Sequence, residues 1–162
     1  IQNGYRNLAF AGEPEHCRSF NERYQGFMHA LSVNKLTPST SQFTGRTVFG
    51  TPPDLEETVN RMIQLPDVFV CANDFVAIDL IRALKKHGIR VPEDVLVTGF
   101  DNSTESRIID PHLTTVDIPS SKMGYIAADL LLSRIKEPDT PYRIMHVRTT
   151  LKFRESTGEL KL

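Results

Sequence analysis

The sequence lacks a charge excess, a long apolar run and a cysteine framework. Its 162 residues carry 19 Lys and Arg against 20 Asp and Glu, a formal net charge of −1, so no basic field attracts nucleic-acid phosphates. The apolar runs extend for only a few residues, too few to span a membrane. The two cysteines, Cys17 and Cys71, form no C-x-x-C pair, and we expect both to be buried or half-buried thiols in a reducing compartment. What remains is a globular domain of ordinary composition.

The sequence also lacks the common catalytic signatures. It has no G-x-G-x-x-G dinucleotide loop, no G-x-x-x-x-G-K-[ST] phosphate loop and no G-x-S-x-G nucleophile elbow. The histidines show no metal-ligand spacing; they are His16, His29, His87, His112 and His146. We therefore expect no catalytic residue, no metal ligand and no cofactor. An enzyme that uses Asp101, for example as a phosphoacceptor, is the alternative that would require turnover.

Apolar strand patterns alternate with amphipathic helix patterns through the first hundred residues. Strands are predicted at Leu8–Ala11, Gln42–Thr44, Val68–Ala72 and Val95–Val97. Helices are predicted between them, at Phe20–Leu31, at Leu55–Leu65, and from a cap at Asn73-Asp74 to a last turn that contains Lys85, Lys86 and His87, with Gly88 just beyond it. This β-α-β-α-β-α-β order, with fully apolar strands, predicts an α/β fold with a doubly wound parallel sheet.

The remaining residues depart from this rhythm. Leu113–Ile118 predicts one more strand, and a helix with the apolar stripe Met123–Ile135 follows it. From Met145 to Arg154, apolar and polar residues alternate, which predicts a long, half-exposed strand.

Polar side chains follow each predicted strand, at the sheet edge where ligands bind in open parallel sheets. This edge collects Glu13, Glu15, His16, Arg18, Ser19, Arg23, Gly45, Arg46, Asn73, Asp74, Asp101 and Asn102. Such a mixture of guanidinium, carboxylate, amide and hydroxyl groups suits a neutral polyhydroxylated ligand. Helix capping and loop hydrogen bonding account for the same residues equally well, so the pattern alone leaves both interpretations open.

Several motifs occur in a fixed order along nearly the whole chain. The longest is VFVCANDFVAIDLIRALKKHGIRVPEDVLVTGFDN, from Val68 to Asn102. The shorter ones are Gly4 to Gly12, Ser19-x-x-x-Arg23-x-x-Gly26-Phe27, PHLTTVDIP at 111–119, Met123-Gly124 and Leu151-x-x-Arg154-x-Ser156-Thr157. In this order and spacing they resemble the effector-binding domain of LacI/GalR-family bacterial transcriptional regulators.

The resemblance implies a periplasmic-binding-protein-like fold, here mainly its C-terminal lobe. Residues 1–103 and 141–157 would form that lobe, and residues 111–136 would be a crossover strand and helix belonging to the otherwise missing N-terminal lobe. The DNA-binding headpiece, the hinge and most of the first lobe would be absent. The stripe Met123–Ile135 would then have no cover, so we expect this helix to pack against a second copy, to swap or to be poorly ordered.

The resemblance also implies which side chains bind the ligand. Arg23, with Ser19 near it, looks like the arginine that grips the sugar, Asn73 like the ligand-binding amide and Asp101 like the ligand-binding carboxylate. Further candidates align only loosely; they are Arg46, Phe49 and Phe75. Phe75 fits a core position as well as a stacking platform for a sugar face. A sugar phosphate or a sugar acid stays open as ligand because Arg18 and Arg46 add positive charge.

The expected function is the effector-sensing and dimerisation part of a sugar-responsive, repressor-type regulator in the cytoplasm. A homodimer would bind operator DNA through the missing headpiece, with no cofactor and no membrane. The dimer surface implied by the resemblance uses Leu55–Leu65, the helix end before Gly88 and the loop Ser103–Pro111. The alternative is a periplasmic or lipoprotein sugar-binding protein of a transport system. The sequence leaves open the effector, inducer versus corepressor action and the operator.

Overall fold

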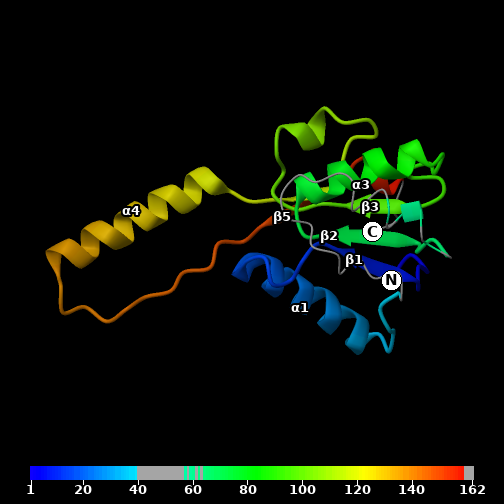
Figure 1. The fold of residues 1–162 in the computed structure, drawn as a ribbon. Helices are drawn as coiled ribbons and strands as arrows, with labels where there is room; N and C mark the ends of the chain where they lie inside the picture. Colours follow the sequence, from blue (N-terminus) through cyan, green and yellow to red (C-terminus); the bar gives the residue numbers. More distant parts are fainter. Residues whose placement is uncertain (40–56, 58, 61, 63, 159–162) are drawn as a thin grey trace.

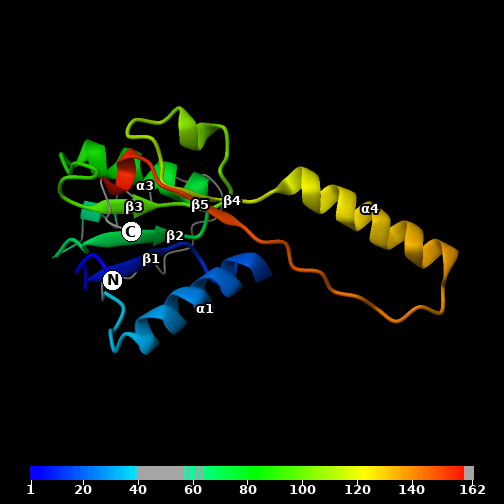
Figure 2. The same cartoon turned by 180° about the vertical axis from the view of Figure 1, so that it is seen from behind.

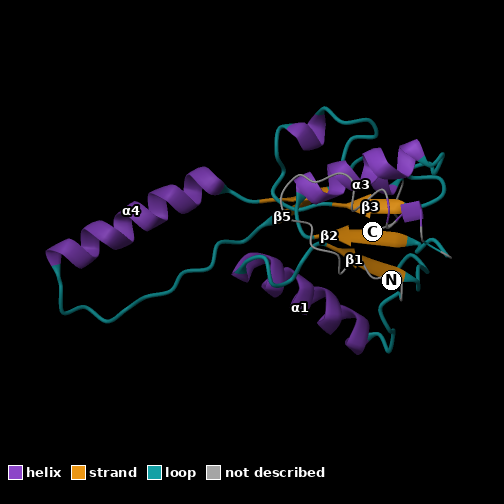
Figure 3. Cartoon of the chain, in the orientation of Figure 1, coloured by secondary structure: helices purple, strands orange, loops and turns teal. Residues whose placement is uncertain are grey.

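The core of the protein is a parallel sheet with a helix on each face (Figures 1 and 3). The computed structural model describes residues 1–39, 57, 59, 60, 62 and 64–158. Its elements are β1 (Leu8–Ala11), α1 (Arg18–Val33), β2 (Val68–Cys71), α3 (Asp74–Lys86), β3 (Leu96–Thr98), η1 (Glu105–Arg107), β4 (Thr115–Asp117), α4 (Ser120–Lys136), β5 (Thr150–Lys152) and η2 (Glu155–Thr157). Strands β1, β2 and β3 lie side by side in that order, all parallel. The predicted strand at Gln42–Thr44 and five of the eleven residues of the predicted helix at Leu55–Leu65 lie outside the described residues.

Alternate residues of each strand face opposite helices. Ala9 and Phe69 belong to the apolar cluster that α3 completes, whereas Phe10 and Leu96 belong to a second cluster with α1. Because side chains alternate across a strand, a sheet covered on both faces needs apolar residues at every position. This is the physical origin of the continuous apolar runs in the sequence, and the predicted doubly wound α/β arrangement is confirmed.

Helix α3 begins and ends where the sequence predicts. The Asn73 side-chain oxygen accepts a hydrogen bond from the Val76 N–H at 2.9 Å, so Asn73 is the N-cap. Gly88, just beyond the C-cap, has a φ of +73°, a backbone conformation that favours glycine. Lys85 and Lys86 occupy the last turn, where the helix dipole favours positive charge.

Helix α4 extends away from the sheet and its two covering helices (Figures 1 and 2). The chain leaves the lobe through β4 and returns through β5, which pair antiparallel. No residue of α4 is buried, and Leu131 and Ile135 are 61% and 65% exposed. The expectation that this apolar stripe lacks cover within its own chain is therefore confirmed for the described residues.

The long strand predicted over Met145–Arg154 forms only at Thr150–Lys152. Residues 141–149 have no regular secondary structure and are almost all exposed. The return segment instead contacts α4, since the Arg134 guanidinium lies 4.4 Å from the centre of the Tyr142 ring. The prediction fails at 141–149 because alternation alone does not make a strand. Backbone groups need a neighbour to bond with, and among the described residues β4 offers one over three positions only.

A buried carboxylate joins α3 to the loop that follows β3. Asp74 is 0% exposed, and it accepts hydrogen bonds from the Thr115 hydroxyl at 2.5 Å and the Ser103 N–H at 2.7 Å. The Asp74 N–H in turn donates to the Phe100 carbonyl at 2.9 Å. A β-carbon at Gly99 would overlap with the Asp74 carboxylate and press on Leu113. The loop therefore approaches α3 at a distance that only glycine permits.

Replacement of Gly99 by alanine is expected to lower the free energy of unfolding by ~1–3 kcal/mol, because the buried carboxylate must shift to admit the methyl group. Gly124→Ala is the matched control, since a β-carbon there meets nothing within 4 Å. This control is expected to leave stability unchanged or to raise it by about 1 kcal/mol, as alanine favours helix. Urea unfolding followed by circular dichroism measures both variants. Equal effects of the two substitutions would contradict the close approach at Gly99.

The exposed stripe of α4 predicts concentration-dependent self-association of this chain. Leu131→Ser combined with Ile135→Ser removes two of its most exposed apolar side chains and is expected to weaken association. Lys122→Ser combined with Lys136→Ser changes the same helix without altering the stripe. Sedimentation equilibrium over a range of protein concentrations measures the difference. A chain that stays monomeric at all concentrations would leave the stripe without a role in self-association.

Candidate functional site

A hollow of about 580 Å³ lies at the carboxyl ends of the strands, between α1 and the loop after β3. Apolar walls come from both sheet and helix, and polar groups come mainly from one face of α1. The lining residues are Phe10, Ser19, Glu22, Arg23, Gly26, Phe27, Val70, Cys71, Thr98, Gly99, Phe100, Val116 and Leu151. This is the edge at which parallel α/β sheets bind ligands, and two of the predicted residues, Ser19 and Arg23, line it.

Arg23 is held on three sides at the edge of this hollow. Its Nη1 donates to the Ala72 carbonyl at 2.6 Å, and its Nη2 lies 3.1 Å from a carboxylate oxygen of Asp101. The guanidinium also lies 3.9 Å from the centre of the Phe100 ring, within the range of a cation–π interaction. With a side-chain exposure of 18%, the guanidinium has a fixed direction and still reaches solvent.

Asp101, the residue after the lining residue Phe100, completes the ion pair with Arg23, which lies 78 residues away in sequence. Its side chain is 35% exposed, and its backbone φ is +117°. Partial burial raises the pKa of the Asp101 carboxyl; Arg23 opposes this rise and the nearby Asp74 charge adds to it. The protein thus keeps a carboxylate where its ionised form is imperfectly solvated, which is typical of a binding group.

Ser19 lies on the first turn of α1 and is exposed. Its hydroxyl is 3.2 Å from the Cys17 sulfur, and this contact is the main cause that lowers the pKa of the Cys17 thiol. Cys17 itself is exposed, contrary to the expectation that both cysteines are buried or half-buried. The reason is its position as the residue before α1, whereas Cys71 lies within the buried sheet, where burial raises its pKa.

The other predicted residues occupy different positions. Asn73 is buried, and its side-chain oxygen is committed to capping α3, directly after the Ala72 carbonyl that Arg23 contacts. Phe75 is half exposed, on the first turn of α3, and is not a core residue. Arg46 and Phe49 lie outside the described residues. The structure therefore brings Ser19, Arg23 and Asp101 together, with Asn73 adjacent.

Sequence reasoning missed a second polar layer behind Asp101. The Asn102 amide nitrogen donates to Asp117 at 2.7 Å, and the Asn102 side-chain oxygen accepts from Arg154. Phe100 beneath Arg23 was missed as well. One signal was present, because Asn directly after Asp101 in the motif GFDN is a residue that tolerates positive φ. Arg154 belongs to the closing motif Leu151-x-x-Arg154-x-Ser156-Thr157, but nothing in that motif predicted its contact with Asn102.

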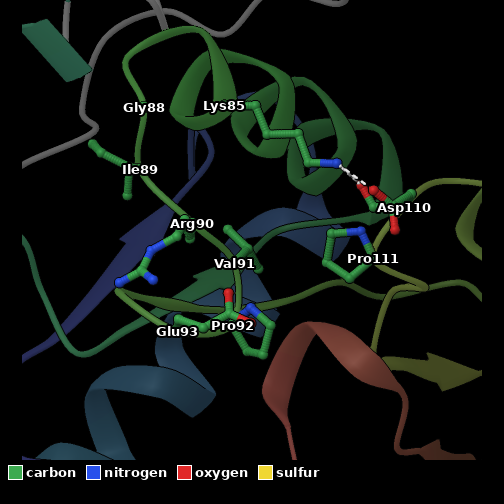
Figure 4. Close-up of a pocket in the computed structure, with 9 residues that line it drawn as sticks. All are labelled: Lys85, Gly88, Ile89, Arg90, Val91, Pro92, Glu93, Asp110 and Pro111. Carbon is green, nitrogen blue, oxygen red and sulfur yellow. Dashed lines mark hydrogen bonds and ion pairs between the residues drawn. The ribbon is translucent and has the colours of Figure 1, made fainter.

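A second hollow, of about 400 Å³, lies at the opposite end of α3 (Figure 4). Its lining includes Gly88, Val91 and the ion pair in which Lys85 Nζ lies 2.7 Å from an Asp110 carboxylate oxygen. This hollow faces the amino ends of the strands, which is not where parallel sheets bind their ligands. We therefore place the candidate site at the Arg23 hollow.

The chemistry of the Arg23 hollow is that of binding. A planar guanidinium donates hydrogen bonds to hydroxyl oxygens, and a carboxylate beside it accepts hydrogen bonds from adjacent hydroxyl groups. Aromatic walls suit the apolar face of a sugar ring. Within the described residues, no group of three or more His, Cys, Asp or Glu side chains could hold a metal ion. The same part of the chain contains no helix that is long and apolar enough to cross a membrane.

Residues 1–157 match the family described as periplasmic binding protein-like domain. The chain is 31% identical to the HTH-type transcriptional repressor PurR of Histophilus somni (strain 129Pt), over 99% of this chain and 48% of that relative. Among solved structures, it is similar to the transcriptional regulator CelR–cellobiose complex (30% identity, TM-score 0.80, 96% of this chain and 48% of the other). It is also similar to a LacI-family regulator from Enterococcus faecium with bound ribose (25% identity, TM-score 0.80, 99% and 59%). The chain thus spans about half the length of the curated relatives it matches.

The raised pKa of Asp101 predicts a distinct dependence of stability on pH. When the pH rises above 3.8, the ordinary pKa of an aspartate, the Asp101 carboxyl keeps its proton in the folded protein but releases it in the unfolded chain. Asp101 therefore lowers the free energy of unfolding as the pH rises toward the pKa of the folded state. Asp101→Asn removes this loss. The stability of the variant relative to the native protein is therefore expected to increase from about pH 4 upward and then level off.

Asp94→Asn is the control of opposite sign. Hydrogen bonding from Arg90 lowers the pKa of Asp94 to about 2, so this carboxylate stabilises the folded protein at any pH above the ordinary pKa of an aspartate. Replacement of Asp94 by asparagine is therefore expected to lower the free energy of unfolding at neutral pH. Urea unfolding of the three proteins between about pH 3 and pH 7 measures both trends. A relative stability of Asp101→Asn that declines with rising pH would contradict the assignment.

Proposed function

This chain belongs to the periplasmic-binding-protein-like domains, in the branch that LacI-family transcriptional regulators use for effector binding, and from this premise we propose that it is the sugar-sensing part of a bacterial repressor. The observation that carries the proposal is the pair formed by Arg23 and Asp101 at the carboxyl edge of the sheet. The related structures with cellobiose and with ribose support a sugar or a sugar derivative as effector.

The effector is held between Arg23 and Asp101 in this proposal. Vicinal hydroxyl groups donate to the carboxylate and accept from the guanidinium, replacing the direct contact between the two side chains. Ser19 contributes its hydroxyl from the first turn of α1. Asn73 contributes its amide nitrogen, because its amide oxygen caps α3. Arg46, Phe49 and Phe75 are proposed as further contacts to the same ligand.

The chain supplies one wall of a two-walled cleft. Residues 1–103 and 141–157 are proposed as the C-terminal lobe, and residues 111–136 as the crossover into an N-terminal lobe. The contact between Arg134 and Tyr142 supports a refinement, in which the chain re-enters the C-terminal lobe at β5, near Thr150, and not at residue 141. The uncovered stripe of α4 is then the surface onto which the remainder of the N-terminal lobe packs.

The proposed regulator acts as a homodimer on operator DNA in the cytoplasm, through a headpiece that lies outside this chain. Two-fold symmetry matches a two-fold operator, and closure of the lobes on the effector changes how the headpieces are presented. The effector shifts the balance of DNA-binding states by the difference in its affinity for them. The implied dimer surface includes the loop Ser103–Pro111, where Ile108 is 73% exposed, while five of the eleven residues of its Leu55–Leu65 part lie outside the described residues.

The two other functional classes receive less support. The named relatives are transcriptional repressors and regulators, so neither a transport protein nor an enzyme follows from them. A transport role would require that the intact protein lack a DNA-binding headpiece, which its coding sequence upstream of Ile1 decides directly.

The central experiment replaces Asp101 and Arg23, each by alanine, in the intact regulator. Loss of a charge-assisted hydrogen bond is expected to weaken sugar affinity by about 10- to 100-fold while operator binding survives. Arg82→Ala is the matched control, because Arg82 is 69% exposed on α3, pairs with Asp79 and does not line the hollow. Calorimetric titration with ribose and cellobiose measures affinity, and electrophoretic mobility shift measures operator binding. Sugar affinity that is unchanged in both site variants would refute the assignment of the site.

A further inference from the structure

The loop that carries Asp101 has an unusual backbone. Asp101 and Asn102 are consecutive non-glycine residues with φ values of +117° and +53°. Such conformations are strained, and they persist only where the surrounding structure determines them. Three backbone bonds hold this loop: Asp101 N–H to the Val116 carbonyl at 2.9 Å, Asn102 N–H to the Thr115 hydroxyl at 3.2 Å, and Ser103 N–H to Asp74 at 2.7 Å.

The Asn102 side chain adds a bridge in both directions. Its amide nitrogen donates to the Asp117 carboxylate at 2.7 Å, and its amide oxygen accepts from the Arg154 guanidinium. Asp117 is the last residue of β4, and Arg154 follows β5 by two residues. One side chain beside the candidate ligand carboxylate is therefore tied to both strands that connect this lobe to α4.

Arg154 is itself fixed by the structure behind the loop. Its Nη1 donates to the Leu113 carbonyl at 2.7 Å and to the Ser106 hydroxyl at 3.1 Å, and its backbone N–H donates to the Thr114 hydroxyl at 2.8 Å. A planar guanidinium with several acceptors has one orientation only. Arg154 therefore acts as a rigid support for Asn102.

We infer that Asn102 and Arg154 are positioning residues, which hold the Asp101 carboxylate in its binding direction and couple that direction to the paired strands β4 and β5. The inference rests on the proposed function and deepens it, because it names the link through which occupancy of the site reaches the connection between the lobes. Asp101 pairs with Arg23, which lines the hollow, whereas the side-chain bonds of Asn102 and Arg154 go to Asp117, Leu113, Ser106 and each other. Their effect on the ligand is therefore exerted through Asp101. A change in the angle between β4 and β5 would move the Asp117 and Arg154 ends of this bridge, and with them the binding carboxylate.

The test is Asn102→Gly in the intact regulator. Glycine adopts a φ of +53° without strain, so the fold loses little, while both side-chain bridges disappear. Lys35→Gly is the matched control, because Lys35 is an exposed non-glycine residue with a φ of +54° at the end of α1, far from the bridge in sequence. Arg154→Lys is the companion variant, which keeps the charge and loses the planar fork.

The first measurement is amide hydrogen exchange of the peptide 99–104, with urea unfolding as the check on global stability. In Asn102→Gly and Arg154→Lys, the amides of this peptide are expected to exchange about tenfold faster than in the native protein, because the loss of one hydrogen bond makes local opening easier by about that factor. The urea midpoint of unfolding is expected to equal that of Lys35→Gly. Exchange in this peptide that equals the native rate in Asn102→Gly would overturn the inference.

The second measurement is calorimetric titration of the intact proteins with ribose and with cellobiose. Asn102→Gly is expected to bind the recognised sugar about tenfold more weakly, and Lys35→Gly to bind it as the native protein does. If Asp101→Ala weakens sugar binding and Asn102→Gly leaves it unchanged, the inference is wrong and the proposed function is retained. If the native protein binds neither sugar, the sugar proposal loses its support, and the exchange measurement still decides whether the bridge positions the loop.

Discussion

The buried carboxylate of Asp74 is the constraint on which the candidate site depends. It has no exposure to solvent, so its two oxygens must be satisfied within the protein, and they are satisfied by Thr115 and by the Ser103 N–H. The Asp74 N–H donates to the Phe100 carbonyl as well. The loop from Phe100 to Ser103 is thus hydrogen-bonded at both ends to Asp74 at the start of α3. Asp101 lies between these two attachment points and projects toward Arg23.

This arrangement exchanges stability for binding. The Asp101 carboxylate is partly buried, its pKa is raised, and its backbone lies in a region that few non-glycine residues adopt. Arg23 offsets part of this cost through the ion pair, and Phe100 supports the guanidinium from below. Groups held in this way are ready to exchange a protein partner for a ligand, because their direction is already determined by their surroundings.

The described chain combines a sheet that is covered on both faces with a helix that is not covered. The two apolar clusters on either side of β1–β3 are covered by α1 and α3, whereas α4 has no buried residue. The polar layer formed by Asn102, Asp117 and Arg154 lies where these two parts meet. In a domain that senses an effector by closing two lobes, a rigid link at this junction is the place where binding and lobe geometry are physically connected.

The fold class and the ends of α3 follow from the sequence alone, because continuous apolar runs, helical spacing, the Asn73 cap and Gly88 are properties of neighbouring residues. Order and spacing of motifs also pointed to Ser19, Arg23 and Asp101, although not to their mutual geometry. Only the tertiary structure decided that Arg23 and Asp101 meet, that Cys17 is exposed, and that residues 141–149 remain without regular structure. The contact between Arg154 and Asn102 joins residues 52 positions apart, and no local pattern encodes such a pair. Side-chain chemistry states what a residue is able to bind, whereas the packing of distant segments decides which partner lies within reach.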